Sequence, residues 1–585
     1  MSEPNVRFRT PTLSRTQVLE RTWPFFLDLS VAACGLALFY GVLRIAQYWL
    51  GHPVPAVEIS PSAKMLPLYA FYSIVRIFVA YVLSLTFAVG YGYIAAYNPR
   101  AEAFMIAALD ILQSIPVLSF LPAVMLAMIS LIPGHQLGVE LGAILLIFTG
   151  QVWNMAFSFY SSLKSLPREL REACRVFRFS AWQRFWQLEL PYSAIGLVWN
   201  SMVSVAGGWF FLMACEMFVL GDRDFRLPGL GSYLQTAAST GDTHAMVWGS
   251  VTMILIIVAT DLLVWRPVIA WADKFKFEQG ESTSRKASPI LYLLQNSIAL
   301  NWLHRATLEP AGEYLYKRLA RRESNLRAQP IHEARKGSRL AAILFLATGA
   351  LLVSFAAFRA VELLRHVTGH ELVELLKGAG ATFLRVNAAL LIASAWTIPA
   401  GVAIGFHPRL ARIAQPLAQI AASYPATAIF PILLIGLVRW GGGLGVGSIA
   451  LMLLGTQWYI LFNVIAGASA IPSNLKEVAQ LYKFSYRQRW TTVILPGIFP
   501  YLVTGLVTAS GGAWNASIVA EYFHLKDQTL STLGLGAEIS AASDHGQFAI
   551  LLLATIIMSL MVVTVNRLVW RPMFRLAENK FRLDT

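Results

Sequence analysis

The sequence predicts an all-α polytopic membrane protein in which about 12 transmembrane helices form two six-helix domains in tandem. Three observations lead to this fold class: a composition too apolar for a soluble protein, a series of long apolar runs, and an internal repeat. Of the 585 residues, 56% are hydrophobic and 14% are charged, whereas soluble domains carry about 25% charged residues. We therefore expect most of the chain to be buried in a lipid bilayer.

The net charge of +15 fits either nucleic-acid binding or membrane topology. The basic residues lie between the apolar runs and form no contiguous patch, which matches the excess of Lys and Arg in cytoplasmic loops of membrane proteins. We therefore expect no nucleic-acid partner. Cys34, Cys174 and Cys215 have no metal-ligand spacing, so we interpret them as small apolar residues and predict no metal site.

Apolar runs of about 20 residues, the length that crosses a bilayer, recur along both halves of the chain. The first half has them near 25–49, 72–97, 104–132, 138–160, 192–220 and 245–265. The second half has them near 340–362, 381–406, 411–438, 446–468, 498–523 and 546–568. The run at 104–132 holds Pro116 and Pro122, so we expect this helix to be kinked or broken.

Charges in the short loops indicate the orientation. The chain begins with a polar stretch before a long apolar run, so we expect a cytoplasmic tail and a signal-anchor span rather than a cleavable signal peptide. The loop after the fourth span is rich in Lys and Arg, and Arg266 and Lys274 follow the sixth, whereas the loop at 221–224 is balanced in charge. This pattern predicts a multi-pass protein of the cell (inner) membrane with both termini in the cytoplasm.

An internal repeat relates the two halves. At an offset of 305 residues, Trp153 recurs as Trp458, and Val264-Trp265-Arg266-Pro267 recurs as Val569-Trp570-Arg571-Pro572. Further upstream the offset is 309, as between Arg76 and Arg385. Because each copy has an even number of spans, both copies enter the membrane in the same direction. An axis along the membrane normal can then relate them and place a shared pathway between them.

The repeat divides the chain into a first membrane domain with its cytoplasmic tail (1–272), a basic cytoplasmic linker (273–339) and a second membrane domain (340–585). The linker has 13 Lys and Arg against 7 Asp and Glu. Its segment Pro289–Leu303 is amphipathic and is predicted to lie on the membrane surface or on a partner. A solvated tether that only joins the halves is the alternative.

The same polar insertion follows the fourth span of each copy. A proline follows a glutamate by nineteen residues in both: Pro191 after Glu172, and Pro496 after Glu477. Pro167 stands where a short helix is expected to begin, a favourable place because its missing N–H would be unpaired there. We expect the closing proline to end that helix before the next span.

This pattern of a glutamate, small residues and a distant Leu-Pro resembles the cytoplasmic loop of binding-protein-dependent ABC importer permeases of type I. Trp209…Glu216…Gly229-Leu230-Gly231 and Trp514…Glu521…Gly534-Leu535-Gly536 are similar to the nitrate, sulfonate, taurine and bicarbonate branch of that family. The resemblance covers almost all of both halves and omits the linker. It implies two permease domains fused in one chain.

The resemblance assigns the coupling of ATP hydrolysis to the two insertions, which we call the docking loops (166–191 and 471–496). In the family, the short helix of each loop docks in a groove on a separate cytoplasmic ATPase, and closure of two ATPase subunits rocks the spans between outward-open and inward-open states. The implied coupling residues are Pro167, Glu169, Glu172, Ala173, Arg178, Pro191, Pro472, Glu477, Ala479, Lys483 and Pro496. The implied partners are two ATPase subunits and a periplasmic or lipid-anchored solute-binding protein.

Two residues depart from the family pattern. The family usually has glycine six residues after the glutamate, where the loop turns, and this chain has Arg178 and Lys483 there. If the turn needs a positive φ, a residue other than glycine costs roughly 1 kcal/mol.

The chain itself is expected to hydrolyse no ATP. It has no Gly-x-x-x-x-Gly-Lys-Ser/Thr loop, and its glycine-rich stretch at 441–447 lacks the phosphate-binding lysine. We interpret that stretch as a loop and close-packing segment. No catalytic residue is therefore predicted, and ATP and Mg²⁺ are expected on the partner ATPase.

Ionisable residues at membrane depth are costly and usually face a cavity or a partner. For the substrate pathway we predict Arg76, Trp209, Glu216, Arg385, Trp514 and Glu521. Alternatives remain open: the arginines can snorkel to the interface, the glutamates can form structural ion pairs with them, and the tryptophans can serve packing alone.

The predicted function is that of the permease subunit of an ATP-driven importer, moving a small solute by alternating access. The branch resemblance implies an anion such as nitrate, sulfonate, taurine or bicarbonate. Glu216 and Glu521 would repel an anion from a shared cavity unless they are paired, so a neutral or cationic solute is the alternative. One alternative keeps the ABC machinery in an exporter or in an importer without a binding protein. The other is a secondary transporter of major-facilitator type, although those proteins carry their signature basic loop after the second span, not the fourth.

Overall fold

The computed structural model describes residues 58–275 and 358–580, with short gaps at 115, 221–222, 440–442 and 526–527, and four isolated residues between 305 and 354. The predicted span near 25–49, nearly all of the one near 340–362 and most of the linker lie outside these residues. The described residues divide into two compact units. One contains 166–198 and 260–275, and the other contains 58–165, 199–259 and 358–580.

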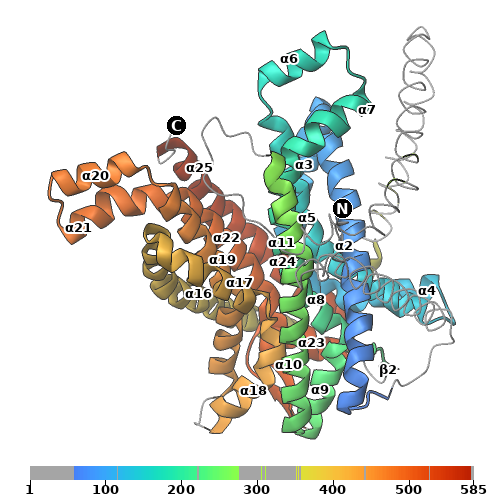
Figure 1. Ribbon diagram of the computed structural model, residues 1–585. Helices are drawn as coiled ribbons and strands as arrows, with labels where there is room; N and C mark the ends of the chain where they lie inside the picture. Colours follow the sequence, from blue (N-terminus) through green and yellow to red (C-terminus); the bar gives the residue numbers. More distant parts are fainter. Residues whose placement is uncertain are drawn as a thin grey trace, which may run out of the picture. The chain divides into compact units, whose positions relative to one another are not determined.

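Helices make up nearly all of the first copy (Figure 1). In order they are η1 (Ala63–Met65), α2 (Leu66–Tyr97), α3 (Pro99–Ser114), η2 (Val117–Phe120), α4 (Leu121–Leu131), α5 (Leu137–Lys164), α6 (Arg168–Val176), α7 (Ala181–Arg184), η3 (Phe185–Glu189) and α8 (Leu190–Glu216). The antiparallel hairpin of β1 (Val219–Leu220) and β2 (Arg223–Asp224) precedes α9 (Leu230–Thr240), α10 (Thr243–Thr260), η4 (Asp261–Trp265), α11 (Arg266–Ala272) and η5 (Asp273–Phe275).

The second copy repeats this order. Its elements are α16 (Gly369–Phe406), α17 (Pro408–Ser423), α18 (Ala426–Arg439), α19 (Leu444–Ala470), α20 (Ser473–Leu481), α21 (Tyr486–Gln488), η7 (Arg489–Ile494) and α22 (Leu495–Ala520). After them come β3 (Tyr522–Leu525), β4 (Gln528–Ser531), α23 (Leu535–Asp544), α24 (Phe548–Val565), η8 (Asn566–Trp570) and α25 (Arg571–Lys580). The β3–β4 hairpin is antiparallel, with Tyr522 opposite Ser531.

The described residues contain 8 helices that are long and apolar enough to cross a membrane, and each coincides with a predicted span. The remaining two predicted spans in this part of the chain are broken. The run at 104–132 is divided among α3, η2 and α4, with Pro116 at the break, as expected. Its counterpart in the second copy bends by 79° between α17 and α18, beside Pro425. Broken helices in a membrane need protein around their freed backbone groups.

The span predicted near 381–406 begins earlier than its apolar residues indicate. α16 starts at Gly369, where Thr368 and Glu371 form a capping box. A capping box satisfies two orphan N–H groups and so favours helix initiation at a polar position. Capping chemistry, rather than the edge of the apolar run, determines where this helix begins.

Four π-turns interrupt the long helices within residues 58–275 and 358–580, and each ends two residues before a proline: η3 before Pro191, η4 before Pro267, η7 before Pro496 and η8 before Pro572. Proline donates no N–H and its ring crowds the carbonyl of the preceding turn, and the wider π-turn accommodates both effects. The helix therefore continues through Pro191 and Pro496. The expectation that these prolines end the docking helix is wrong.

In the larger unit, α19 packs against α16 and α22, and α2 packs against α5. Small residues allow the close approach: a Cβ on Gly405 of α16 would lie 2.8 Å from the Ile465 carbonyl oxygen of α19. Hydrogen bonds also join the copies. The Leu118 amide donates to Asn515 Oδ1 at 3.4 Å. Residues from both copies thus contribute to one packed core.

Candidate functional site

The docking loops share one backbone design. α6 ends in a turn in which the Phe179 amide donates to the Cys174 carbonyl at 2.9 Å and the Arg178 amide donates to the Arg175 carbonyl at 3.1 Å. In the second copy the Phe484 amide donates to the Ala479 carbonyl at 3.0 Å. This pairing is the Schellman motif, which satisfies the last carbonyls of a helix when the residue after the C-cap adopts a left-handed conformation.

That left-handed residue is Arg178 in the first loop (φ 52°) and Lys483 in the second (φ 50°), and among the described residues no other non-glycine has a positive φ. The turn does require positive φ, so the predicted cost of about 1 kcal/mol applies at both positions. After the turn, a capping box starts the next helix in each loop: Ser180 with Gln183, and Ser485 with Gln488. The turn and the box, not the distant proline, separate the two helices of the loop.

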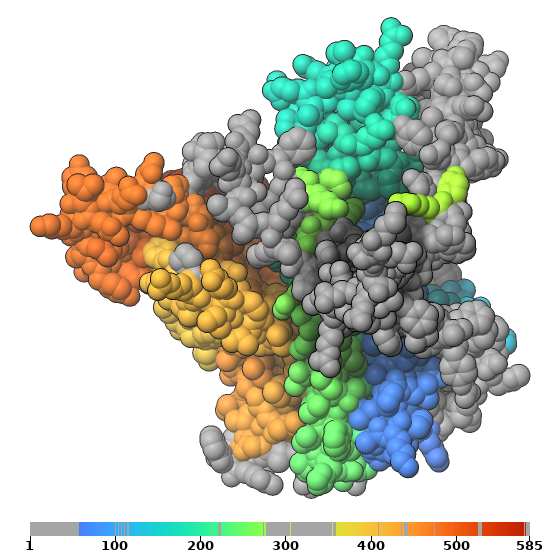
Figure 2. All heavy atoms as spheres, viewed as in Figure 1, coloured from blue at the N-terminus to red at the C-terminus, as the bar shows by residue number. Residues whose placement is uncertain are grey.

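Each turn exposes a pair of apolar side chains beside the left-handed cation. Val176 is 77% exposed and Phe177 is 73% exposed in the first loop, and Leu481 (80%) and Tyr482 (75%) take their places in the second. The second loop forms a projecting lobe of its unit, shown in orange (Figure 2). Such a tip presents more apolar surface than a solvated loop needs.

The other predicted coupling residues fall on two sides of each short helix. Glu169 and Glu172 are exposed on α6, and Glu477 is exposed on α20. Ala479 is buried and Ala173 is half-buried. Pro167 and Pro472 occupy the N-cap position, one residue before the predicted helical start. Pro191 and Pro496 are half-buried in the following helices.

On the second loop a cation anchors the docking helix to a span. Lys476 of α20 lies 4.6 Å from the ring centroid of Phe406, the last residue of α16. A cation over an aromatic face contributes about 0.5–1 kcal/mol at an exposed site. This contact joins α20 to the C-terminal end of α16.

The predicted pathway residues of the first copy meet in a buried ion-pair cluster. Arg76 of α2 binds Glu140 through two hydrogen bonds of 2.6 Å and donates to Glu216 at 2.8 Å. Ser73 also donates to Glu216, at 2.6 Å, and the Gly231 amide does so at 2.7 Å. These charged side chains are at most 1% exposed. Arg76 is thus paired within the protein and does not snorkel to the interface.

The second copy has a corresponding cluster in which the arginine pairs with one carboxylate instead of two. Arg385 donates to Glu521 at 3.0 Å and to Thr532 at 2.9 Å. Thr382, at the position of Ser73, bonds Glu521 at 2.9 Å, and the Gly536 amide donates to the same carboxylate at 2.9 Å. Arg385 is 16% exposed, against 1% for Arg76.

The difference between the clusters lies at one position that the sequence reasoning missed. Glu140 supplies a second carboxylate in the first copy, and its counterpart at the 305-residue offset is Gly445. A carboxylate among the apolar residues of α5 was the available signal. The positive end of α9 helps to compensate the second negative charge, since Glu216 accepts from the first turn of that helix. Two carboxylates therefore share one guanidinium and one helix N-terminus.

These clusters explain the Glu…Gly-Leu-Gly pattern. A Cβ on Gly229 would lie 2.2 Å from the carboxylate carbon of Glu216, and one on Gly534 would lie 2.2 Å from an oxygen of Glu521. Glycine is needed because the glutamate sits directly against the helix start. Trp209 (3% exposed) and Trp514 (1%) are buried nearby along α8 and α22, and Trp514 packs beside the ring of Phe383.

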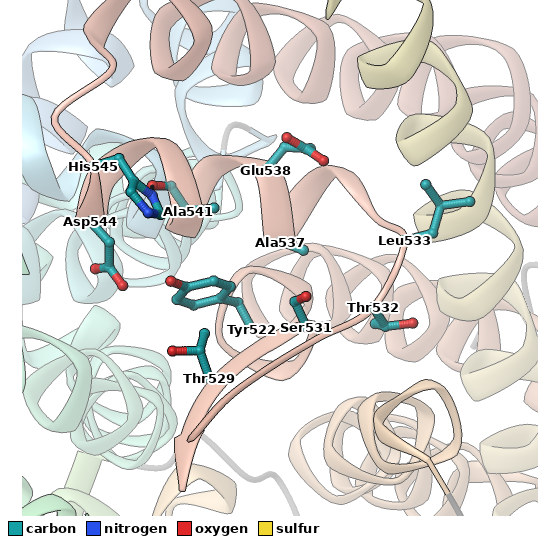
Figure 3. Close-up of a pocket in the computed structure, with 10 residues that line it drawn as sticks. All are labelled: Tyr522, Thr529, Ser531, Thr532, Leu533, Ala537, Glu538, Ala541, Asp544 and His545. Carbon is teal, nitrogen blue, oxygen red and sulfur yellow. Dashed lines mark hydrogen bonds between the residues drawn. The ribbon is translucent and has the colours of Figure 1, made fainter. Parts of the chain in front are cut away.

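A pocket of about 690 Å³ lies between the β3–β4 hairpin and α23 of the second copy (Figure 3). Thr532, which binds Arg385, is in its wall, and none of the predicted pathway residues lines it. In the figure the hydroxyl of Tyr522 points toward Asp544. Burial raises the pKa of Tyr522, and its hydrogen bond to Asp544 raises that pKa further. Tyr522 therefore stays protonated at neutral pH.

Comparison with known proteins identifies the family to which this architecture belongs. A family model described as the binding-protein-dependent transport system inner membrane component matches residues 88–265 and 397–571. The nitrate import permease NrtB of Leptolyngbya laminosa is 28% identical over 32% of this chain and 64% of its own length. The taurine transport permease TauC of Escherichia coli is 28% identical over 28% of this chain and 56% of its own length. The bicarbonate transport permease CmpB of Synechococcus elongatus is 30% identical over 24% of this chain and 49% of its own length.

The chain spans about half to two thirds of the length of these three relatives. The two matched segments begin 309 residues apart and together cover more than half of the chain. The first segment contains α6 and Glu216, and the second contains α20 and Glu521. This protein therefore belongs to the family of binding-protein-dependent transport system inner membrane components, and it carries that component twice.

Proposed function

We propose that this chain is the complete membrane-spanning part of an ATP-driven importer of a small anion. The observation that carries the proposal is the duplicated docking loop, in which the same helix, the same left-handed turn and the same exposed apolar pair recur at matched positions. Relatives named for nitrate, sulfonate, taurine and bicarbonate transport support an anionic solute.

Each docking loop supplies one helix for one ATPase subunit. The exposed apolar tip fits a groove on a cytoplasmic partner, as amphipathic helices do in other complexes. One copy of this chain therefore pairs with two ATPase subunits, which bind ATP and Mg²⁺, and a solute-binding protein delivers the anion from the outer side. The purified complex should contain one copy of this chain for each ATPase pair. Two copies for each pair would contradict the fused arrangement.

The anion passes along the interface between the copies, with the clusters of Arg76 and Arg385 near its outer end. Closure of the ATPase pair moves the docking loops, and the rigid spans then rock between outward-open and inward-open states. The anion cannot cross a bilayer unaided because burying its charge without compensation is expensive.

Reconstituted vesicles containing this chain, its ATPase and the solute-binding protein test the solute class. Labelled nitrate, bicarbonate and taurine are offered separately, with a labelled organic cation as the control. We expect saturable uptake of at least one anion that depends on ATP. Saturable, ATP-dependent uptake of the cation and of no anion would show that the substrate class is wrong.

The double variant Glu172→Ala with Glu477→Ala tests the coupling role. Both carboxylates are exposed and lie outside the spans, so membrane insertion should be unchanged. We expect ATPase binding or ATP-driven uptake to fall at least tenfold, the effect of losing roughly 1.4 kcal/mol or more of contact energy. The matched control is Glu374→Ala, whose carboxylate is 56% exposed outside both loops. Normal uptake by the double variant, with the ATPase bound, would refute the coupling role.

A further inference from the structure

Several polar side-chain atoms buried in the described part of the first copy form no hydrogen bond. They include Nε2 and Oε1 of Gln151 on α5 and the hydroxyl oxygen of Ser204 on α8. Gln151 is 0% exposed and Ser204 is 2% exposed. Both residues lie in the middle part of candidate spans. Buried polar groups are nearly always hydrogen-bonded, and each unsatisfied one carries a desolvation penalty. Gln151 and Ser204 could therefore bind a ligand at this depth without losing an existing hydrogen bond.

The packing of α5 against α8 places these atoms together. Gly208 faces Gln151, since a Cβ on Gly208 would lie 2.3 Å from Nε2 of the amide. Farther along the same pair of helices, Ser201 donates to the sulfur of Met155 at 3.3 Å. Ser204 lies between these two contacts, one helical turn from Gly208 on the same face of α8. The glycine removes the side chain that would otherwise cover the amide.

The same part of α8 also faces the second copy. A Cβ on Gly207, the neighbour of Gly208, would be in ordinary van der Waals contact, at 3.5 Å, with the hydroxyl oxygen of Tyr459 on α19. The unpartnered amide and hydroxyl are therefore beside the interface between the copies, where the repeat symmetry places the shared pathway.

The second copy does not repeat this polar set. At the 305-residue offset, Thr456, Ala509 and Ala513 replace Gln151, Ser204 and Gly208. The hydroxyl of Thr456 donates to the Met452 carbonyl of its own helix at 2.6 Å. The counterparts of Gln151 and Ser204 thus leave no polar side-chain atom without a partner, although the indole nitrogen of Trp514, next to Ala513, has none.

We propose that the amide of Gln151 and the hydroxyl of Ser204 form an oxyanion-binding subsite on the substrate pathway, present in the first copy only. The proposal rests on the proposed function and adds where, and in which half, the anion is bound. Amide N–H and hydroxyl O–H groups are suitable donors to the oxygens of nitrate, a sulfonate or bicarbonate. They carry no formal charge, so they hold the anion weakly enough to release it.

Both side chains are sealed from solvent in this conformation, which corresponds to a pathway closed at this level. Rocking of one copy against the other separates α8 from α19 and opens the subsite. The anion then meets donors that were already fixed by packing, which lowers the cost of binding.

Reconstituted complexes of this chain with its ATPase and the solute-binding protein provide the test, with labelled nitrate, bicarbonate and taurine as probes. We expect Gln151→Leu to raise the KM for the transported anion by at least tenfold, because a hydrogen bond to a charged group is lost. Thr456→Val, the matched change in the second copy, should alter the KM less than twofold. An unchanged KM in Gln151→Leu overturns the subsite, whereas a wild-type complex that transports no anion refutes the proposed function instead.

A second measurement does not depend on uptake. Ser204→Cys, in a Cys34→Ser background, is treated with a small anionic thiol reagent during ATP turnover. Cys174 and Cys215 are buried, and burial raises the pKa of the Cys174 thiol, so background labelling should be slow. We expect labelling at residue 204 that the transported anion slows, and much slower labelling of Ala509→Cys. If Ser204→Cys is not labelled in any of the nucleotide states tested, residue 204 is permanently buried in the packed core, and the proposal is overturned.

Discussion

Replacing Arg178 by glycine is expected to stabilise the turn that closes the first docking loop, and Lys483→Gly should do the same in the second. Both residues have a left-handed backbone, with φ of 52° and 50°. Their side chains are exposed, so the substitution removes backbone strain without removing a buried contact. The expected sign is therefore a gain in local stability.

The magnitude follows from two opposing effects. A left-handed conformation costs a residue with a Cβ roughly 1–2 kcal/mol. Glycine loses more backbone freedom on folding, which offsets about 0.5–1 kcal/mol of that relief. The net gain is about 0.5–1 kcal/mol per loop, and it corresponds to a roughly two- to fivefold slower opening of the turn by hydrogen exchange.

Hydrogen exchange of the Phe179 and Phe484 amides measures this gain directly, because these amides close the turn by donating to Cys174 and Ala479. The purified chain in lipid nanodiscs is compared with each glycine variant. The matched control is Arg178→Ala, which removes the charge and keeps the Cβ. We expect protection to rise in the glycine variants and to stay within experimental error in Arg178→Ala.

Equal protection in the alanine and glycine variants would show that charge, and not backbone conformation, determines the stability of the turn. Lower protection in Arg178→Gly would contradict the reasoning more directly. The same variants also separate two roles of the cation in coupling. If ATPase binding falls in both Arg178→Gly and Arg178→Ala, the side chain contacts the partner. If ATPase binding falls in Arg178→Gly alone, coupling depends on the restricted backbone of the loop at this position.

Two further predictions concern the buried clusters. Arg76→Gln should destabilise the chain by about 3–5 kcal/mol because it leaves two buried carboxylates without a cation. Thermal unfolding should show a smaller loss of stability for Arg385→Gln, which leaves only one buried carboxylate without a cation. Equal losses in the two variants would contradict the asymmetry between the clusters. Gly229→Ala and Gly534→Ala should each cost about 1–3 kcal/mol through overpacking against a glutamate, whereas Gly511→Ala, with no atom within 4 Å of its added Cβ, should be close to neutral in the same assay.

The features that could be predicted from the sequence are those carried by local patterns. Apolar length predicted the spans within the described residues, and Pro116 predicted a broken helix. The repeat predicted two matching loops after the fourth span of each copy, and the missing glycine at Arg178 and Lys483 indicated where backbone strain would appear. Each signal depends on residues that are adjacent along the chain, on a comparison of the chain with itself or, for the missing glycine, on the family pattern, so no knowledge of helix packing is required.

The tertiary structure decided what the buried polar residues contact. The sequence left Arg76 and Glu216 with several alternatives, and the packing of α2, α5 and α8 brings them together with Glu140. The same packing leaves Gln151 and Ser204 without partners. Which atoms meet across two helices depends on their rotation and relative height, and a change of one residue in register moves a side chain by about 100° around its helix. Hydropathy along the chain contains no information on that register, so the pairing of the arginines and the isolation of the amide are properties of the folded bundle.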